Sequence, residues 1–214
     1  MSEMKRLSDR NRAIQEMLTS GEGLKTFYRF VANNPHIALH DACQIVIERP
    51  SASICFSFEE WNAQGRRVTK GRKGIPYYDN DGSKHFVFDV SDTHGDNRYR
   101  RSINPVKKIL DGLDLVNGTE IAGSNRGDYR IMLSGVVNYL GQNEFFTEDE
   151  DRNRLIAEGA TYLLYSTTGF PKDRGITLKG YPYGLSENAD LFREILKTTE
   201  VLQQDINDAV ANKQ

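Results

Sequence analysis

Two β-type runs joined by a polar turn constrain the fold of this chain more than any other segment. Residues 74–90 read GIPYYDNDGSKHFVFDV, and Asp79–Gly82, between the two runs, consists of residue types that turns favour. Gly82 can adopt a positive φ, which suits a tight connection between antiparallel strands. Side chains alternate along a strand, so Phe86 and Phe88 share one face of the second run. The segment therefore predicts an antiparallel hairpin, with the two phenylalanines as candidates for its core face.

Helical periodicity flanks this hairpin on both sides, because apolar residues recur there at intervals of three and four. The helices expected before the hairpin span residues 7–23, with Ser8 as N-cap, 24–35 and 36–50. The helices expected after it span residues 104–113, 129–141, 147–169, with Thr147 as N-cap, and 187–210. A strand at 51–58, a short helix at 58–66 and a polar loop at 91–102 complete the prediction.

This order of elements predicts an α+β fold. A helical lead-in and a small antiparallel sheet come first, and a mostly helical second domain follows. Residues 115–128 are rich in Gly and Asn and poor in apolar side chains, which is typical of a linker. We therefore expect two domains, at residues 1–115 and 128–214.

The net charge of −2 hides a local excess of positive charge. Residues 61–110 contain 11 Lys and Arg against 5 Asp and Glu, whereas residues 111–214 contain 10 against 17. The segment 65–78, GRRVTKGRKGIPYY, has five cations among three glycines. Glycine lets a ligand approach the backbone, and cations together with exposed N–H groups can hold phosphate oxygens. We expect an anion site in this segment.

Aromatic residues interleave with these cations, a combination that is typical of single-stranded nucleic-acid binding. Cations follow the phosphates while bases stack on aromatic rings, largely without regard to sequence. The candidate contact residues are Trp61, Arg66, Arg67, Lys70, Arg72, Lys73, Tyr77, Tyr78, Arg98, Arg100 and Arg101. The structural alternative is a solvated basic turn, with Trp61 and the phenylalanines in a core.

The sequence contains no recognisable catalytic or metal-binding motif. His36 and His40 have the spacing of two ligands on a helix, but Ile37 stands where HExxH has its Glu. Cys43 and Cys55 lie in apolar runs and are expected to be buried free thiols. We predict a protein that is not an enzyme, with no catalytic residues, metal or cofactor. With no apolar signal sequence and no run of about 18 apolar residues, we expect a cytoplasmic protein without membrane contacts.

The central segment also resembles a known family. FSFEEWNAQGRRVTKGRKGIPYY, followed by KHFVFDVSDTHGD, is similar to the N-terminal domain of ArdC-type antirestriction proteins and of the related LtrC-like proteins of plasmids and conjugative elements. The resemblance covers residues 24–95. It implies a single-stranded DNA-binding module in a plasmid, conjugative element or phage. It also implies that the framework of this module includes Trp61, Arg66, Arg67, Lys70, Lys73 and the strand Phe86–Asp89.

Many members of that family continue into a zinc metallopeptidase-like domain with HExxH on one helix and a Glu on the next. The matching positions here are Ser134, Gly135 and Asn138, which cannot supply the His ligands and the Glu base. Glu158 alone could match the later Glu. The resemblance thus implies either a degenerate, metal-free zincin-like second half or a plain helical domain.

Two other functions remain open. The acidic helices of the second half could dock a host or conjugation protein, which would make the chain a protein-interaction module. A divergent or inactive metallopeptidase is the other alternative. Because the resemblance extends to longer mobile-element proteins, the chain could also be the front end of a larger protein.

Overall fold

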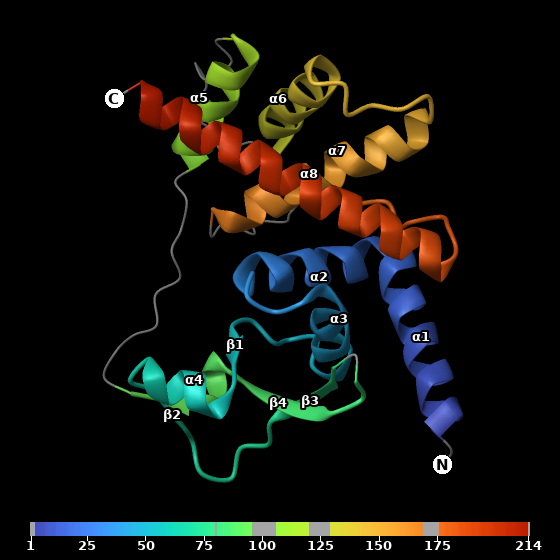
Figure 1. The fold of residues 1–214 in the computed structure, drawn as a ribbon, viewed down its shortest axis with the longest axis vertical. Coiled ribbons are helices and arrows are strands. Elements are labelled where there is room, and N and C mark those ends of the chain that lie inside the picture. Colours follow the sequence, from blue (N-terminus) through green and yellow to red (C-terminus); the bar gives the residue numbers. More distant parts are fainter. Residues whose placement is uncertain (1–2, 80, 96–105, 120–128, 169–175, 214) are drawn as a thin grey trace. The chain divides into compact units, whose positions relative to one another are not determined.

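The chain divides into two compact units, Met1–Ser102 and Ile103–Gln214, in the computed structural model (Figure 1). The described residues are 3–79, 81–95, 106–119, 129–168 and 176–213. Helix α5 (Val106–Asn117), which the sequence places in the first domain, instead packs against α6 (Tyr129–Gln142) and α8 (Leu185–Asn212) of the second unit. The predicted domain boundary therefore lies too far along the chain. A Gly- and Asn-rich composition marks an irregular segment, but it does not show which helices the helix before that segment packs against.

Three helices open the first unit: α1 (Glu3–Thr19), α2 (Gly21–Asn33) and α3 (Leu39–Glu48). The side chain of Ser20 accepts a hydrogen bond from the backbone N–H of Gly23 and so caps α2. The expected N-cap at Ser8 is wrong, since α1 begins at Glu3 and runs through Ser8. The residues before Ser8 are mostly good helix formers, and an interior Ser is a small cost beside them.

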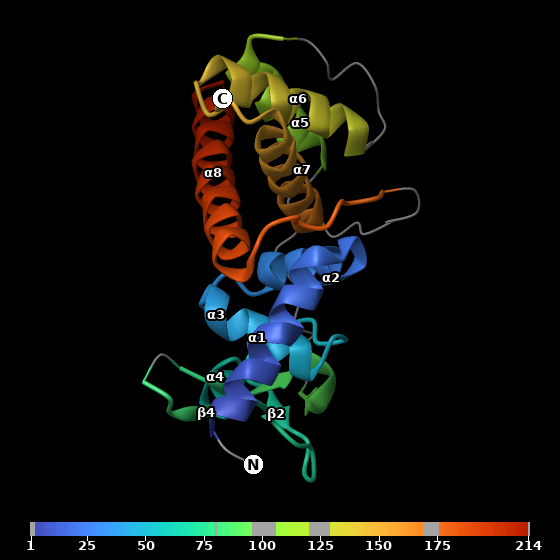
Figure 2. The ribbon, with the colours of Figure 1, turned by 90° about the vertical axis from the view of Figure 1, so that its right-hand side faces the viewer.

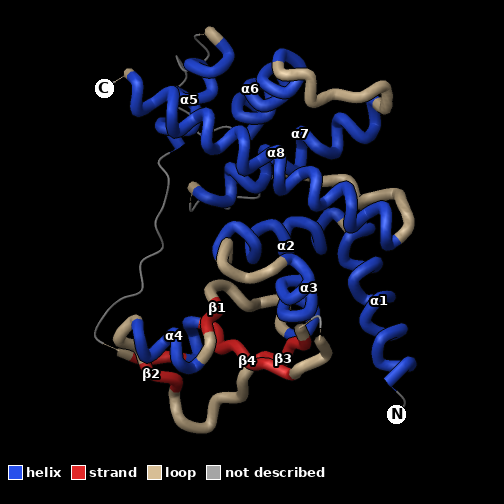
Figure 3. The backbone as a smooth tube through the Cα atoms, in the orientation of Figure 1, coloured by secondary structure: helices blue, strands red, loops and turns tan. Residues whose placement is uncertain are grey.

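A three-stranded antiparallel sheet follows, in the order β1 (Cys55–Phe56), β4 (Lys84–Asp89), β3 (Ile75–Tyr78) (Figure 3, red). The predicted hairpin is confirmed: β3 pairs with β4, and Gly82 adopts a φ of +80° in the turn between them. The strand predicted at 51–58 is much shorter than expected, since only two of its residues pair with β4.

The face of the hairpin that meets the core is the opposite of the predicted one, which carried Phe86 and Phe88. Val87 of β4 and its cross-strand partner Ile75 are buried, and α3 packs against β3. Phe86 is 48% exposed on the other face. Large aromatic residues are usually placed in cores by their burial energy, so the exposed ring is the less expected arrangement.

The first unit also contains a two-stranded sheet, whose strands come before β3 and after β4 in the chain. Helix α4 (Phe58–Ala63) leads into β2 (Arg67–Val68), which pairs antiparallel with β5 (Thr93–His94) after the short 3-10 helix η1 (Val90–Asp92). Ser57 and Glu60 form a reciprocal capping box at the start of α4. The polar loop predicted from residue 91 onward therefore begins with a 3-10 turn and a strand.

The described residues of the second unit contain four helices, and each packs against two others (Figure 2). Helix α8 contacts α5 and α7 (Glu150–Thr167), and α6 contacts the same two. The expected inward residues of α8 are confirmed as fully buried: Leu191, Ile195, Leu202 and Ile206. The N-cap of α7 is Asp149, whose carboxylate accepts from the N–H of Arg152, so the predicted cap at Thr147 is wrong by two residues.

These elements confirm the predicted α+β class, with a small antiparallel sheet in the first unit and a helical second unit. Within the described segments, none of the helices combines the length and apolar character needed to cross a membrane.

Gly112 gives a test of how closely α5 packs on α8. A Cβ at this position would lie 2.5 Å from Cγ2 of Ile206, which is well inside van der Waals contact. Gly→Ala in a helix normally stabilises by about 1 kcal/mol. We expect Gly112→Ala to destabilise the second unit by about 1–3 kcal/mol instead, measured by urea unfolding with far-UV circular dichroism.

Gly141→Ala, in α6, is the matched control, since its added Cβ would make only ordinary contacts at 3.7 Å. A Gly112→Ala, Ile206→Ala double variant should lose less stability than the two single changes add up to. A stabilising effect of Gly112→Ala would contradict the packing described.

Candidate nucleic-acid interface

Trp61 occupies the centre of the first unit rather than its surface. Its side chain is 0% exposed, and its Nε1–H donates a 2.8 Å hydrogen bond to the backbone carbonyl of Phe88. Its ring meets the edge of Phe56, with centroids 5.0 Å apart. A sealed indole cannot stack on a base, so the predicted contact at Trp61 is wrong, and the residue joins α4 to β4 instead.

Arg66 is also used within the fold. Its guanidinium donates to Oγ1 of Thr93 at 2.8 Å and to the carbonyl of Thr93 at 3.2 Å. The same group lies 5.9 Å from the centroid of the Trp61 ring. Arg66 therefore joins the segment before β2 to β5 above the buried indole, and its charge is only partly available to a ligand.

The loop that follows β2 is anchored by a buried carboxylate. Asp92 forms ion pairs with Arg49 and, at 3.8 Å, with Arg72, and its backbone carbonyl accepts from the N–H of Thr69. Arg72 is nevertheless 57% exposed in its side chain. It therefore holds the loop in place while part of its guanidinium still faces solvent.

The remaining cations of the loop are directed outward. Arg67, Lys70 and Lys73 are exposed, as is Lys84 at the start of β4. In the part of the chain that the structure describes, no carboxylate lies within ion-pair distance of any of these four side chains. Their charges are thus uncompensated by close partners, which favours an anionic ligand.

Two phenylalanine rings, absent from the sequence-based candidates, are exposed beside these cations. Phe58 is 49% exposed on α4, and Phe86 is 48% exposed on β4. Phe88 lies between them: its ring centroid is 6.5 Å from that of Phe58, and a Cβ on Gly74 would touch both Phe86 and Phe88. The lack of a side chain at Gly74 therefore lets the basic loop lie directly against this aromatic row.

Lys84 completes the arrangement, with its Nζ 5.0 Å from the centroid of the Phe86 ring. The set of exposed rings and cations will be called the basic-aromatic surface; its members are Phe58, Arg67, Lys70, Lys73, Lys84 and Phe86. No local sequence rule marks Phe58 or Phe86 as exposed.

The two tyrosines predicted as base contacts are partly engaged elsewhere. The Tyr77 ring stacks on His85 with centroids 5.4 Å apart, and burial raises the pKa of its hydroxyl. The guanidinium of Arg10 lies 4.9 Å from the centroid of Tyr78, whose backbone N–H and carbonyl pair with Gln44. Each tyrosine thus has a ring partner within the fold.

The other three predicted contacts lie outside the described residues: Arg98, Arg100 and Arg101.

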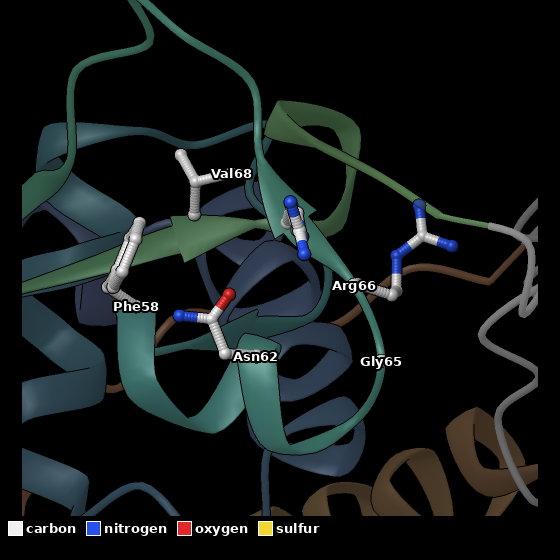
Figure 4. Close-up of a pocket in the computed structure, with 6 residues that line it drawn as sticks. Phe58, Asn62, Gly65, Arg66 and Val68 are labelled. Atoms are coloured by element: carbon white, nitrogen blue, oxygen red, sulfur yellow. The ribbon is translucent and has the colours of Figure 1, made fainter.

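A pocket of about 590 Å³ opens in the angle between α4 and β2 (Figure 4). It is lined by Phe58, Asn62, Gly65, Arg66, Arg67 and Val68. Figure 4 shows Phe58 and Asn62 rising from the same helix on the same side. The pocket therefore shares one ring and one cation with the basic-aromatic surface.

The residues considered for metal binding have other partners. His36 stacks on Phe56, and its Nε2 forms a 2.9 Å hydrogen bond to the carbonyl of Cys55, which accepts. His40 pairs with Gln44 and Asp41. Among the described residues, no three His, Cys, Asp or Glu side chains are grouped to hold a metal ion.

Cys43 and Cys55 are buried free thiols, and burial raises the pKa of each to about 12.

The positions matched to a metallopeptidase in the second unit carry no metal-binding set. Ser134 is exposed and Gly135 is buried on α6. Glu158 of α7 is half-buried, which raises the pKa of its carboxyl group, while Arg154 and Lys179 act in the opposite direction. Burial therefore affects the pKa of this carboxyl group more than the two cations do.

No protein-family model and no curated protein matches the chain. The crystal structure of the antirestriction protein ArdC from the R388 plasmid, in its metal-free form, is similar with a TM-score of 0.42 and 16% sequence identity. The match covers 78% of this chain and 84% of that one.

Asp89, at the end of β4, gives a test of how the interface is held. Burial would raise the pKa of its carboxyl group, but hydrogen bonds from Ser91 and Ser53 outweigh it and lower the pKa below its ordinary value. The Ser53 N–H donates at 2.6 Å and the Ser91 N–H at 2.9 Å. A lowered pKa contributes stability above the pKa of the unfolded state, and this stability is lost as the pH falls through the folded-state pKa.

We expect Asp89→Asn to destabilise the first unit by about 1–3 kcal/mol at pH 7, since an amide N–H₂ would face backbone donors. The variant should lose less stability than the wild type between pH 6 and pH 3. Urea unfolding followed by the fluorescence of Trp61, the single tryptophan, reports on this unit. Asp81→Asn, at an exposed turn position, is the control, and equal pH dependence in wild type and Asp89→Asn would refute the assignment.

Proposed function

We propose that this protein binds single-stranded DNA through the basic-aromatic surface of its first unit, without strong sequence preference and without catalysis. The observation that carries the proposal is the placement of two half-exposed phenylalanine rings among four cations that form no ion pair with a carboxylate of the described residues. Cations of this kind follow a phosphate backbone, and each exposed ring offers a face to a base.

A single strand suits this surface better than a duplex. In a duplex the base faces are covered by stacking, so Phe58 and Phe86 would meet only sugar and phosphate. In a single strand the bases can turn outward and cover both rings. Stacking a base on each ring also removes the exposed surface of that ring from water, which favours binding.

The biological setting is part of the same proposal. The sequence resemblance over residues 24–95 supports a role in a plasmid, conjugative element or phage, as an antirestriction or DNA-processing accessory. Other DNA-processing proteins of the element or the host are the further partners that such a role would involve.

The test is a fluorescence-anisotropy titration of a labelled oligo-dT at several salt concentrations. Each phosphate neutralised on a single strand contributes about −0.7 to the slope of log K against log salt, so four cations predict a slope of roughly −2.8. Lys70→Gln, Lys73→Gln should reduce the magnitude of the slope by about 1.4. Phe86→Ala should weaken binding by about 1–3 kcal/mol while leaving the slope unchanged.

Lys197→Gln, Lys213→Gln is the matched control, because it removes two exposed cations from the second unit and changes the net charge equally. It should bind as the wild type does. Absence of binding at low salt, or an equal loss in the control and the loop variant, would refute the proposal.

A further inference from the structure

The pocket between α4 and β2 combines a ring, an amide and a cation. Phe58 and Asn62 are four residues apart on α4, a spacing that puts their side chains on one face of a helix. Both line the pocket, and Figure 4 shows them side by side. Its volume of about 590 Å³ lies within the range of roughly 300–1,000 Å³ that small-molecule sites span, a size that suits one nucleotide.

The side chain of Asn62 is available for a ligand. Asn62 is exposed, and no group among the described residues forms a hydrogen bond with its amide. An amide offers one acceptor oxygen and two N–H donors, so it can pair at two points with the edge of a base. Arg67, at the same pocket, is exposed, and no carboxylate of the described residues forms an ion pair with it, which suits a neighbouring phosphate.

Adenine matches this set of groups best. Its N6 donor and N7 acceptor are complementary to the oxygen and the N–H₂ of an asparagine. Adenine offers such a pair at its Watson–Crick edge as well, through N6 and N1, whereas guanine has two acceptors at its N7/O6 edge and matches an amide on its Watson–Crick edge instead. A pyrimidine has a smaller ring and would overlap less with Phe58.

We propose that this pocket holds one adenine base of the bound strand, stacked on Phe58, paired with the amide of Asn62 and flanked by a phosphate on Arg67. This inference rests on the proposed function and deepens it. The rest of the basic-aromatic surface reads no base edge, and the pocket adds a single position at which the identity of the base matters.

The test is a competition assay with labelled oligo-dT bound to the whole chain. The competitors are four unlabelled 12-mers: oligo-dT, and oligo-dT with one central dA, dG or dC. We expect the dA competitor to bind about fivefold more tightly than the other three, the lower end of what a two-point base contact contributes. Asn62→Ala should abolish this advantage and bind oligo-dT within about twofold of the wild type.

The variant is expected to fold, because Ala replaces an exposed helical residue and is the best helix former. Asn11→Ala, at an exposed position on α1, is the matched control and should keep the dA advantage. Equal competition by all four oligonucleotides, or a dA advantage that survives in Asn62→Ala, would overturn the inference. Either result leaves the salt-dependent binding of oligo-dT intact, whereas failure of the wild type to bind oligo-dT refutes the proposed function itself.

Discussion

The hydrogen bond from the indole of Trp61 to the carbonyl of Phe88 is the contact on which the first unit depends. It joins the short helix α4 to the strand β4, and each of these carries one of the two exposed rings. A helix of six residues is too short to be stable alone, so it needs such a buried anchor. Arg66 then lies over the indole and bonds to Thr93, which fixes the start of the basic loop relative to the same anchor.

Residues of the same type therefore have different roles around this anchor. Trp61 and Arg66 make contacts within the fold, and Asp92 forms ion pairs with Arg49 and Arg72 that hold the loop. The neighbours of these residues, Arg67 and Lys70, are left exposed. A rigid support beneath exposed cations and rings lowers the ordering cost of binding, because the ligand meets groups that are already in position.

The sequence predicts the elements of this structure well and the exposure of its aromatic residues poorly. The hairpin about Gly82 and the buried stripe of α8 follow from local rules, turn chemistry and helical periodicity, so both could be predicted. Which face of β4 meets the core depends on α3, a partner distant in the sequence, and alternation alone pointed to Phe86 instead of Val87. Trp61 was a candidate because indoles stack well, but only the fold reveals that Phe58 is the ring that solvent reaches. The position of α5 was missed for the same reason, since an apolar stripe shows that a helix is packed but does not show which elements it packs against.

The central claim is that DNA contacts the first unit at the basic-aromatic surface. A titration of the ¹⁵N-labelled protein with oligo-dT, followed by backbone amide chemical shifts, tests it most directly. The account predicts that the largest shifts fall on residues 58, 65–74 and 84–88, while amides in α7 and α8 stay unchanged. Shifts confined to the helices of the second unit, with residues 65–74 unaffected, would contradict it.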